Sequence, residues 1–463
     1  MSKKIFVLRV FRRGVFLMRK ALLSVHQFAS RVEHWLSARI EGRPFPALAE
    51  QITAKSFDEV YYSANAYITP VMPALPKAGR APAVVVLVPT LSDSSLFGGV
   101  ATALIFAALY SNKTGKRLRV VQTVVNGKVS KLQGLFDKYH IPIDAASIEV
   151  ISVAERRYNY YGYLDLHPED QLVVSAWWDA MIAAALPLKR RFIYLVQDYE
   201  PIFYANGDTR LLAEHSYKTQ RFVAVCNTQL MVRCVKDSEI MGPRTPMVSF
   251  EPAVARLIDN RKSPLPEKSK KTLFFYGRPG VERNLFYFGL RVINEAFSRG
   301  LLDREAWDIV MAGEAQVPNI QLECGAIVRN LGKLSLDEYD DLKCRTDLVL
   351  SLMMAPHPSY PPLEFALAGA AVVTTVYGPK KDLSAYSANI VCAEPELEPM
   401  LDALKRAAGM PMSERVLNAG VTILPERWEV AFEAVFSQIP NLVQIPMASS
   451  EYEIESLTPS SIS

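Results

Sequence analysis

The sequence contains few cysteines and no long apolar stretch. Its five cysteines are an odd number in 463 residues, and no two form a Cys-x-x-Cys pair. This pattern argues against a disulfide framework or a cysteine zinc site and is typical of reduced thiols in a cytoplasmic protein. No run of about 18 apolar residues is present, so we expect no transmembrane helix. Histidines at metal-ligand spacing and an Asp-x-Asp triplet are also missing, so we expect no metal site.

Net charge is small, but it is unevenly distributed. The whole chain carries +4, whereas residues 1–40 alone hold nine basic residues and one acid. The remaining, slightly acidic part lacks the basic clustering of nucleic-acid-binding proteins, so nucleic acid is not an expected partner. Residues 1–40 are predicted to form a basic amphipathic segment. It either binds an anionic membrane surface or is a poorly ordered or packed extension.

That segment lacks an uninterrupted apolar core and a cleavage site of a signal peptide, because Arg12, Arg13, Arg19 and Lys20 interrupt it. We therefore expect a cytoplasmic protein. If residues 1–40 bind lipid, the expected place is the inner face of the plasma membrane.

Two successive series of short apolar runs alternate with helical stretches. Continuous β-branched runs of this kind are typical of a parallel sheet buried on both faces. The sequence therefore predicts an α/β fold with two doubly wound, Rossmann-like domains. The runs are Ala83–Val88, Leu118–Val124, Ile148–Val153, Leu172–Ala176, Phe192–Val196, Phe222–Val225 and Pro246–Phe250, then Thr272–Tyr276, Trp307–Met311, Asp347–Leu352, Ala371–Thr375 and Asn389–Cys392.

Composition also suggests domain boundaries. We predict an N-terminal Rossmann-like domain over residues 41–256 and a C-terminal one over 272–427. The intervening residues 257–271 are polar, contain two prolines and are predicted to be a linker. A last helix is expected over 428–446, and residues 447–463, rich in Ser, Glu and Thr, are expected to be disordered.

A glycine-bearing turn with two arginines follows the first strand of the second series. Residues 274–284 have the sequence Phe-Phe-Tyr-Gly-Arg-Pro-Gly-Val-Glu-Arg-Asn. Gly277 would let the backbone approach a ligand, and the next helix would point its free N–H groups at the same place. Arg278 and Arg283 add forked donors suited to a diphosphate. We predict an anion site that includes Asn284; the alternative is a surface loop with solvated arginines.

A second candidate stretch follows the run that ends at Leu352, at the carboxyl edge of the predicted sheet, where such sheets bind ligands. Its prolines stiffen a loop before a short helix. Glu364 is expected in the first turn of that helix, where its carboxylate can accept two adjacent hydroxyls, as on a ribose. Alternatively, the helix dipole alone stabilises an acid at this position.

These two stretches resemble glycosyltransferase family 4. Arg278 and Arg283 are similar to that family's Arg…Lys pair, with Arg in place of the usual Lys. Residues 362–369, Pro-Leu-Glu-Phe-Ala-Leu-Ala-Gly, resemble the signature in which the Glu holds the nucleotide ribose. The family's earlier Glu, eight residues before, is replaced by Pro356. The resemblance leaves contact with the donor sugar to the three nearby candidates His357, Ser359 and Tyr360.

A third motif, Gln-Asp-Tyr-Glu-Pro-x-Phe, occupies residues 197–203. Together with the two stretches above, it makes residues 80–440 similar to bacterial rhamnosyltransferases of the WsaF type. The resemblance implies a GT-B fold, with an acceptor domain, a donor domain and a last helix that crosses back. It implies retaining, metal-independent transfer of rhamnose from dTDP-rhamnose to a growing cell-surface polysaccharide. The implied partners are a nucleotide sugar and a glycan or lipid-linked glycan acceptor, without a cofactor.

Polar residues also follow two strands of the first series. Gly98 and Gly99 would let the backbone approach the donor phosphates, or they only form a tight connection. Gln197 is a candidate for a hydrogen bond to the donor sugar, and Asp198 for positioning an acceptor hydroxyl. Both lie at a carboxyl edge, but polar loop residues are the alternative.

Trp177, Trp178 and Asp179 follow another strand at this edge. Aromatic faces stack on sugars, so we consider an acceptor contact, although tryptophans more often belong to the core. Two other functions stay open at this point. One is a nonenzymatic, nucleotide-sugar-binding scaffold. The other is a glycoside hydrolase, for which Asp198 and Glu200 are the available carboxylate pair.

Overall fold

The computed structural model describes residues 55–76, 79–92, 96, 98–127, 132–159, 162–255, 257 and 270–445. The predicted amphipathic segment 1–40, most of the predicted linker and the predicted tail 447–463 lie outside these residues and stay predictions. Among the described residues, no helix is both long and apolar enough to cross a membrane.

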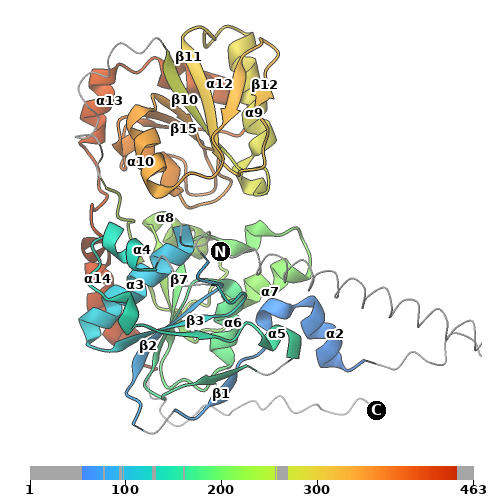
Figure 1. The fold of residues 1–463 in the computed structure, drawn as a ribbon, viewed down its shortest axis with the longest axis vertical. Helices are drawn as coiled ribbons and strands as arrows, with labels where there is room; N and C mark the ends of the chain where they lie inside the picture. The colour runs from blue at the N-terminus through green and yellow to red at the C-terminus, as the bar shows by residue number, and fades with distance from the viewer. Residues whose placement is uncertain are drawn as a thin grey trace, which may run out of the picture. The chain divides into compact units, whose positions relative to one another are not determined.

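The first domain is built on a seven-stranded sheet in which all neighbouring strands are parallel (Figure 1). Its strand order is β4-β3-β2-β6-β7-β8-β9. The strands are β2 (Ala83–Val88), β3 (Arg117–Gln122), β4 (Glu149–Ser152), β6 (Gln171–Val174), β7 (Phe192–Val196), β8 (Phe222–Asn227) and β9 (Met247–Phe250).

Both faces of this sheet are covered, as the continuous apolar runs require. In β2, Val84 and Val86 enter one core cluster and Val85 enters the other, because successive side chains point to opposite faces. The first cluster includes α3 (Gly98–Thr114), α4 (Leu132–Lys138) and α14 (Trp428–Leu442). The second includes α6 (Trp177–Ala185), α8 (Gln229–Asp237) and Tyr217, which follows α7 (Asp208–Ser216).

The second domain repeats this plan. Its sheet has the order β12-β13-β11-β10-β14-β15-β16, and only β12 is antiparallel to its neighbour. One face carries α9 (Phe286–Ser298) and α12 (Leu397–Ala408), and the other carries α10 (Leu336–Arg345) and α11 (Tyr360–Leu367). The strands are β10 (Lys271–Gly277), β11 (Trp307–Gly313), β12 (Ile320–Gln321), β13 (Ile327–Asn330), β14 (Leu348–Leu350), β15 (Ala371–Thr375) and β16 (Ile390–Ala393).

The prediction of an α/β fold with two doubly wound domains is therefore confirmed. In each sheet the first strand, β2 or β10, has the next long strand on one side and a later strand, β6 or β14, on the other. The loops after these strands diverge there, and open α/β sheets bind ligands at the crevice that this leaves. The functional site is therefore expected at the carboxyl ends of β2, β6, β10 and β14.

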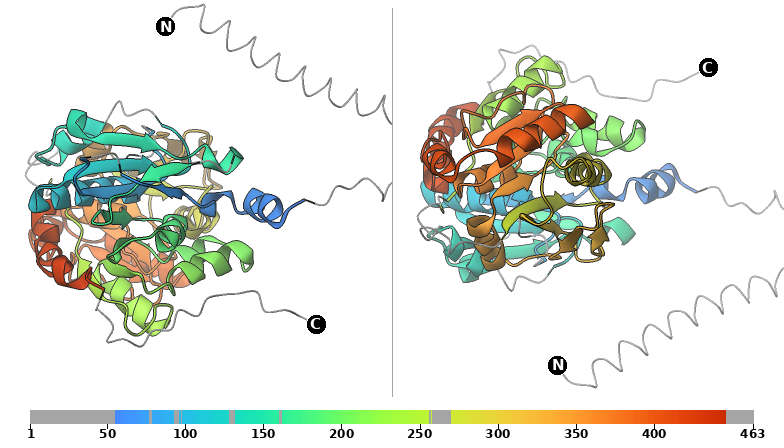
Figure 2. Two further views of the ribbon diagram at one scale, coloured as in Figure 1. Left: turned by 90° about the horizontal axis from the view of Figure 1, so that it is seen from below. Right: turned by 90° about the horizontal axis from the view of Figure 1, so that it is seen from above.

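The last helix and several side chains connect the two domains. α14 lies beside α3 (Figure 1, Figure 2), and the Phe432 ring packs against Phe106 with ring centres 5.0 Å apart. Lys138 of α4 pairs with Asp340 of α10 at 3.0 Å. Tyr386 of the second domain donates to Glu251, which follows β9, at 2.9 Å.

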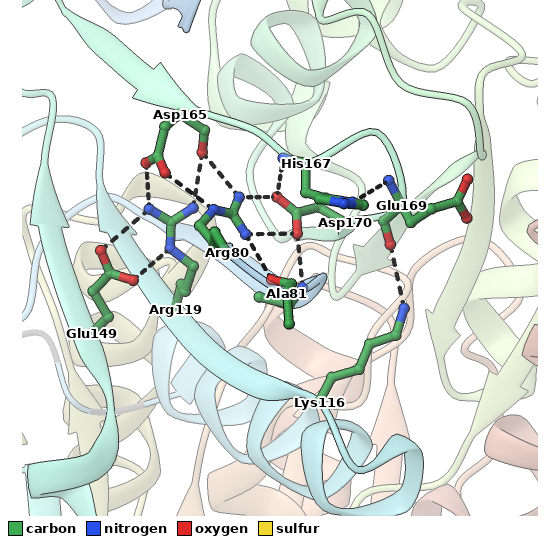
Figure 3. A network of polar contacts seen from close by, with 10 residues as sticks. Arg80, Ala81, Lys116, Arg119, Glu149, Asp165, His167, Glu169 and Asp170 are labelled. Atoms are coloured by element: carbon green, nitrogen blue, oxygen red, sulfur yellow. Dashed lines mark hydrogen bonds and ion pairs between the residues drawn. The ribbon is translucent and has the colours of Figure 1, made fainter. Parts of the chain in front are cut away.

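A polar network lies at the opposite, amino edge of the first sheet (Figure 3). Arg119 of β3 bonds Glu149 of β4 and Asp165 of β5 (Tyr163–Asp165). Arg80 also bonds Asp165, and it bonds Asp170, which accepts the amide hydrogen of Ala83 at 2.7 Å. These bonds fasten the beginnings of β2, β3, β4 and β6 to the end of β5, and they lie away from the carboxyl edge.

Candidate functional site

The two predicted arginines follow β10 and lie near each other. Arg278 donates from Nη1 to the Tyr276 hydroxyl at 3.4 Å, and Arg283 belongs to the turn η6 (Glu282–Asn284). Both side chains are half-buried. Burial lowers the pKa of Arg283, and the charge of Arg278 lowers it further. Two like charges with little solvent around them suit a doubly charged ligand such as a diphosphate.

Arg283 also contacts the first domain. Its Nε lies 3.7 Å from Oδ2 of Asp198, and its guanidinium lies 3.9 Å from the centre of the Phe203 ring. At 3.7 Å the ion pair is too long for a hydrogen bond, and Nε has no other acceptor in the described part of the chain. The guanidinium therefore keeps free hydrogen-bonding capacity next to the carboxyl edge of the first sheet.

Asp198 is the partner of Arg283 in this ion pair. Burial raises the pKa of its carboxyl group, although Arg283 counteracts the rise. The pKa values of both partners thus move toward the neutral forms, because the loss of water outweighs their mutual attraction. The positive charge of Arg283 is therefore only partly balanced by Asp198, and a bound phosphate would supply the remaining negative charge.

The predicted residues Gly98, Gly99 and Gln197 come together at the first sheet. Gln197 directly follows β7 and donates from Nε2 to the Gly99 carbonyl at 2.8 Å. Gly98 begins α3 with φ +52°, a backbone conformation that favours glycine. The Gln197 Oε1 accepts no hydrogen bond from the described residues. The structure thus joins the loops after β2 and β7 and leaves one amide oxygen available.

Gly277 is closely packed in the structure, and its approach to a ligand stays a prediction. A Cβ at this position would lie 3.1 Å from the Phe286 ring and 3.5 Å from the Met311 sulfur. The packing of α9 on the sheet therefore leaves little room for a side chain at this position. Close backbone approach is instead needed at Gly313, with φ +140°, where a Cβ would lie 2.6 Å from Cγ of Arg278. Gly313 was not predicted, although it ends β11.

The helix after the arginines is α9, and a short 3₁₀ turn precedes it. Residues 282–284 form a 3₁₀ turn, Leu285 is left-handed (φ 49°, ψ 46°), and α9 begins at Phe286. The amides of Asn284 and Leu285 already donate to Val281 and Glu282. The amides still free for a ligand are those of the first turn of α9.

Three hydrogen bonds involve residues 352–354, which follow β14, and two of them link this segment to Arg283 and Asn284. The Met354 amide donates to the Arg283 carbonyl at 2.8 Å, and Asn284 donates from Nδ2 to the Leu352 carbonyl at 3.1 Å. Lys380, which was not predicted, is fully buried and donates from Nζ to the Met353 carbonyl at 2.8 Å. Burial lowers the pKa of Lys380 to about 8, while Asp198 counteracts this. Lys380 is thus a further positive charge close to the arginines.

His357 is buried as a neutral side chain. Its Nδ1 accepts the amide hydrogen of Ser359 at 2.9 Å, which places the ring proton on Nε2. Burial lowers the pKa of His357 to about 3, and the charges of Lys380 and Arg283 add to this effect. The Nε2 has no partner among the described residues. His357 is therefore a buried N–H donor with an unused hydrogen bond.

Tyr360 connects the two domains instead of pointing free into a site. Its hydroxyl lies 3.0 Å from that of Thr102 in α3. Burial raises the pKa of Tyr360 to about 12, so it stays a neutral phenol. Ser359, the residue before it, is left-handed with φ +71° and is 6% exposed. Of the three sugar-contact candidates in this loop, His357 has the clearest free donor.

Glu364 lies in the second turn of α11, so its prediction in the first turn was wrong. The helix dipole is therefore not the reason for a carboxylate here. Oε2 accepts a hydrogen bond from Tyr339 at 3.0 Å, and Oε1 lies 3.9 Å from Nζ of Lys343. The carboxylate is 22% exposed and has lone pairs left for two ribose hydroxyls.

Two of the three predicted acceptor residues belong to the core. Trp177 is 3% exposed and donates from Nε1 to the Tyr204 hydroxyl at 2.9 Å. Asp179 is 0% exposed, and burial raises its pKa to about 7. Burial of these two side chains does not favour direct contact with an acceptor, which stays a prediction. Trp178 is half-buried and lies next to Tyr67, with ring centres 5.4 Å apart.

The carboxylates of Asp198 and Glu200 have different partners. Asp198 faces Arg283, whereas Glu200 accepts a hydrogen bond from the Tyr194 hydroxyl at 3.0 Å. Burial raises the pKa of Glu200 to about 8. Glu200 is thus held within the first domain.

Comparison with protein families matches both halves of the chain. The WsaF N-terminal domain matches residues 84–229, and the WsaF C-terminal domain matches residues 271–405. The O-antigen biosynthesis protein RfbC of Myxococcus xanthus is 31% identical over 293 residues. This match covers 62% of the chain but only 22% of RfbC, so the chain spans about a fifth of that relative.

Solved structures with the same fold are distant in sequence. The Anabaena protein Alr3699/HepE, solved with UDP and glucose, has a TM-score of 0.52 at 14% identity, covering 78% of this chain and 99% of that one. A glycosyltransferase from Rickettsia africae has a TM-score of 0.52 at 12% identity, covering 78% and 99%. Sucrose-phosphate synthase from Thermosynechococcus elongatus gives 0.52 at 10%, covering 78% and 98%. These similarities confirm the GT-B fold.

Proposed function

The chain belongs to the WsaF family of glycosyltransferases, and on this basis we propose that it transfers a sugar from a nucleotide-sugar donor to a glycan of a cell-surface polysaccharide. The polysaccharide is suggested by the RfbC relative, an O-antigen biosynthesis protein. The observation that carries the proposal is the pair Arg278 and Arg283. They follow β10 at the crevice of the second sheet, and Arg283 faces Asp198 of the first.

In the proposed complex, the second domain holds the donor. Glu364, held by Tyr339 and Lys343, accepts hydrogen bonds from the ribose hydroxyls. Arg278, Arg283 and the first turn of α9 bind the diphosphate. When the bond between sugar and phosphate breaks, negative charge develops on the leaving diphosphate. Donors already placed there stabilise that charge without reorganisation, which lowers the barrier.

The first domain places the acceptor at the same bond. Asp198 is proposed to position the acceptor hydroxyl, and Gln197 to contact the donor sugar through its free Oε1. The acceptor attacks from the face that the diphosphate leaves, and the leaving phosphate takes the acceptor proton. The C1–phosphate bond breaks as the new C1–oxygen bond forms, so the configuration is retained and no enzyme nucleophile is required.

We propose dTDP-rhamnose as the donor and catalysis without a divalent metal, both from the resemblance to rhamnosyltransferases. Pro356 stands where glycosyltransferase family 4 has its first Glu, so another group must bind the donor sugar. The unused Nε2–H of His357 suits a sugar hydroxyl or a phosphate oxygen, since it is neutral and buried.

An initial-rate assay tests the proposal. It measures transfer from dTDP-rhamnose, UDP-glucose and GDP-mannose to octyl α-L-rhamnoside, each with and without EDTA. We expect the highest rate with dTDP-rhamnose and no loss on chelation. Arg278→Ala should lower the rate about 100-fold, as the loss of one preorganised donor does at other enzymes. Arg291→Ala, on the exposed side of α9, is the control and should keep the rate.

Equal rates in Arg278→Ala and Arg291→Ala would remove the proposed role of the arginine pair. Tight nucleotide-sugar binding with neither transfer nor release of nucleoside diphosphate would instead favour the scaffold alternative. Complete loss of activity with EDTA, restored by a divalent metal, would contradict the metal-free mechanism.

A further inference from the structure

Aromatic side chains from three separate loops meet at the carboxyl edge of the first sheet. Tyr67 lies in the turn η2 (Ala66–Ile68), Trp177 and Trp178 begin α6, and Tyr204 follows η4 (Glu200–Phe203). Ring centres are 5.4 Å apart between Tyr67 and Trp178, and 5.7 Å between the two tryptophans. Trp177 and Tyr204 meet edge to face at 6.1 Å. We call these rings, together with Phe203, the aromatic strip.

The aromatic strip ends at the proposed donor site. The rings of Tyr204 and Phe203 are 6.5 Å apart, and the Arg283 guanidinium lies 3.9 Å from the centre of the Phe203 ring. Both Tyr67 and Arg283 are close enough to Tyr204 to influence its ionisation. The strip therefore connects an exposed ring of the acceptor domain with an arginine of the donor domain.

The far end of the strip is open and carries unused polar groups. Tyr67 is 45% exposed, and the Arg157 guanidinium lies 4.6 Å from the centre of its ring. The Nε1–H of Trp178 and the Nε–H of Arg157 have no acceptor in the described part of the chain. Unpaired buried donors are rare in folded proteins, and a binding function is one explanation for them.

A buried arginine holds this end in place. Arg156 is fully buried and donates to the carbonyls of Tyr67 at 3.2 Å and Thr69 at 2.8 Å. It also donates to Thr123 after β3 and to Val153 after β4, the latter at 3.1 Å. Arg156 thus fixes the loop that carries Tyr67 to the carboxyl ends of two strands. A preorganised surface loses little entropy when it binds a ligand.

We propose that Tyr67, Trp178 and Arg157 form a subsite for a pyranose ring of the acceptor glycan, one or more sugar units from the ring that reacts at Asp198. The apolar C–H face of a pyranose fits an aromatic face, while guanidinium and indole N–H groups bind its hydroxyls. This inference rests on the proposed function, because it identifies the acceptor as a glycan that lies along the aromatic strip.

Saturation-transfer NMR on the full chain tests the subsite directly. The probes are the methyl α-glycosides of rhamnose, glucose, galactose and mannose, with dTDP added to occupy the donor site. We expect the wild type to bind at least one glycoside and Tyr67→Ala to weaken binding about 10-fold, in line with the loss of an aromatic contact. Tyr67→Phe should retain binding, because it keeps the ring. Trp178→Phe and Arg157→Gln test the other two groups.

Two variants separate this inference from the proposed function. Tyr163→Ala removes an exposed ring of β5 in the same domain and should bind glycosides as the wild type does. Arg278→Ala should lose nucleotide affinity and keep glycoside binding in the absence of dTDP. No response of the wild type to any of the four glycosides, or equal affinities in Tyr67→Ala and Tyr163→Ala, would overturn the subsite. If the wild type did not bind dTDP, that result would count against the proposed function and not against the subsite.

Discussion

At the residue scale, the candidate site combines charged and polar groups that are poorly satisfied in the unliganded protein. Arg283 has an ion pair at 3.7 Å and an Nε without a hydrogen bond. His357 has a free Nε2, and Gln197 has a free Oε1. Leaving such groups unpaired costs free energy, so their grouping is better explained by a ligand than by stability. A nucleotide sugar offers phosphate oxygens and hydroxyls that match these groups.

His357 gives a prediction for the dependence of stability on pH. Its pKa is about 3 in the folded protein, against about 6.5 for an exposed histidine. The unfolded chain therefore binds a proton between these values and the folded protein does not. The stabilising contribution is present above pH 6.5 and is lost as the pH falls below it. We expect a slope of up to about 1.4 kcal/mol per pH unit from this group.

Urea unfolding of the wild type and of His357→Gln between pH 7 and pH 5 measures this contribution. The free energy of unfolding should fall more steeply with decreasing pH in the wild type than in the variant. His215→Gln, at an exposed position on α7, is the control and should leave the wild-type slope unchanged. Parallel curves for the wild type and His357→Gln would mean that His357 has the same pKa in the folded and the unfolded protein, which would contradict its neutral burial.

Part of this site could be predicted from residues alone. Short motifs that follow a strand contain three of its residues, Arg278, Arg283 and Glu364. Lys380, Gly313 and Tyr67 gave no such signal. Lys380 acts through the Met353 carbonyl 27 positions earlier, and Tyr67 precedes the first long strand. Their importance arises from tertiary contacts, which local sequence does not encode.

At the element scale, the long strands were predictable because both faces of each sheet are buried. β2 and β15, for example, are fully buried apolar runs. The missed pair β1 (Met72–Ala74) and β5 (Tyr163–Asp165) has three residues per strand. Pro73 interrupts β1, and its partner lies about 90 residues later. Neither periodicity nor propensity detects a pairing of that kind.

Helix beginnings were the least predictable feature. The prolines after Ser359 were interpreted as part of a stiff loop, yet Pro361 and Pro362 lie in the first turn of α11. Proline fits there because the first amides of a helix lack intrahelical partners. The helix therefore begins earlier than expected, which puts Glu364 in the second turn. Leu285, just before α9, adopts a left-handed conformation that is rare for leucine.

The polar network at the amino edge of the first sheet gives a prediction at this scale (Figure 3). Asp170 has a fully buried side chain that bonds Arg80 and the amides of Ala83 and His167. Asp170→Ala leaves these donors without an acceptor. We expect a loss of about 3–5 kcal/mol in the free energy of unfolding, as for other broken buried pairs.

The neighbouring residue offers the matched control. Glu169 pairs with Arg190 at the surface, where the two side chains are 38% and 31% exposed. Glu169→Ala should cost less than about 1 kcal/mol, because exposed ion pairs contribute little. Chemical denaturation of both variants measures the difference. Equal losses for Asp170→Ala and Glu169→Ala would show that the network does not fasten the strands.

At the scale of the whole molecule, the function depends on bringing two carboxyl edges together. The sequence predicted two similar domains, each with ligand loops, but not which loops meet. The structure pairs Arg283 with Asp198 and Tyr360 with Thr102, and returns α14 to the first domain's core. The arginines proposed to bind the donor thus lie beside the loops proposed to bind the acceptor, and no argument from a single sheet predicts this contact.

The central claim is that Arg278 and Arg283 bind the diphosphate of the donor. Isothermal titration calorimetry with dTDP measures this most directly, on the wild type, Arg278→Ala, Arg283→Ala and the control Arg291→Ala. We expect the first two variants to bind about 10- to 100-fold more weakly, as the loss of a charge-assisted hydrogen bond predicts, and the control to bind like the wild type. Wild-type affinity for dTDP in both Arg278→Ala and Arg283→Ala would contradict the claim.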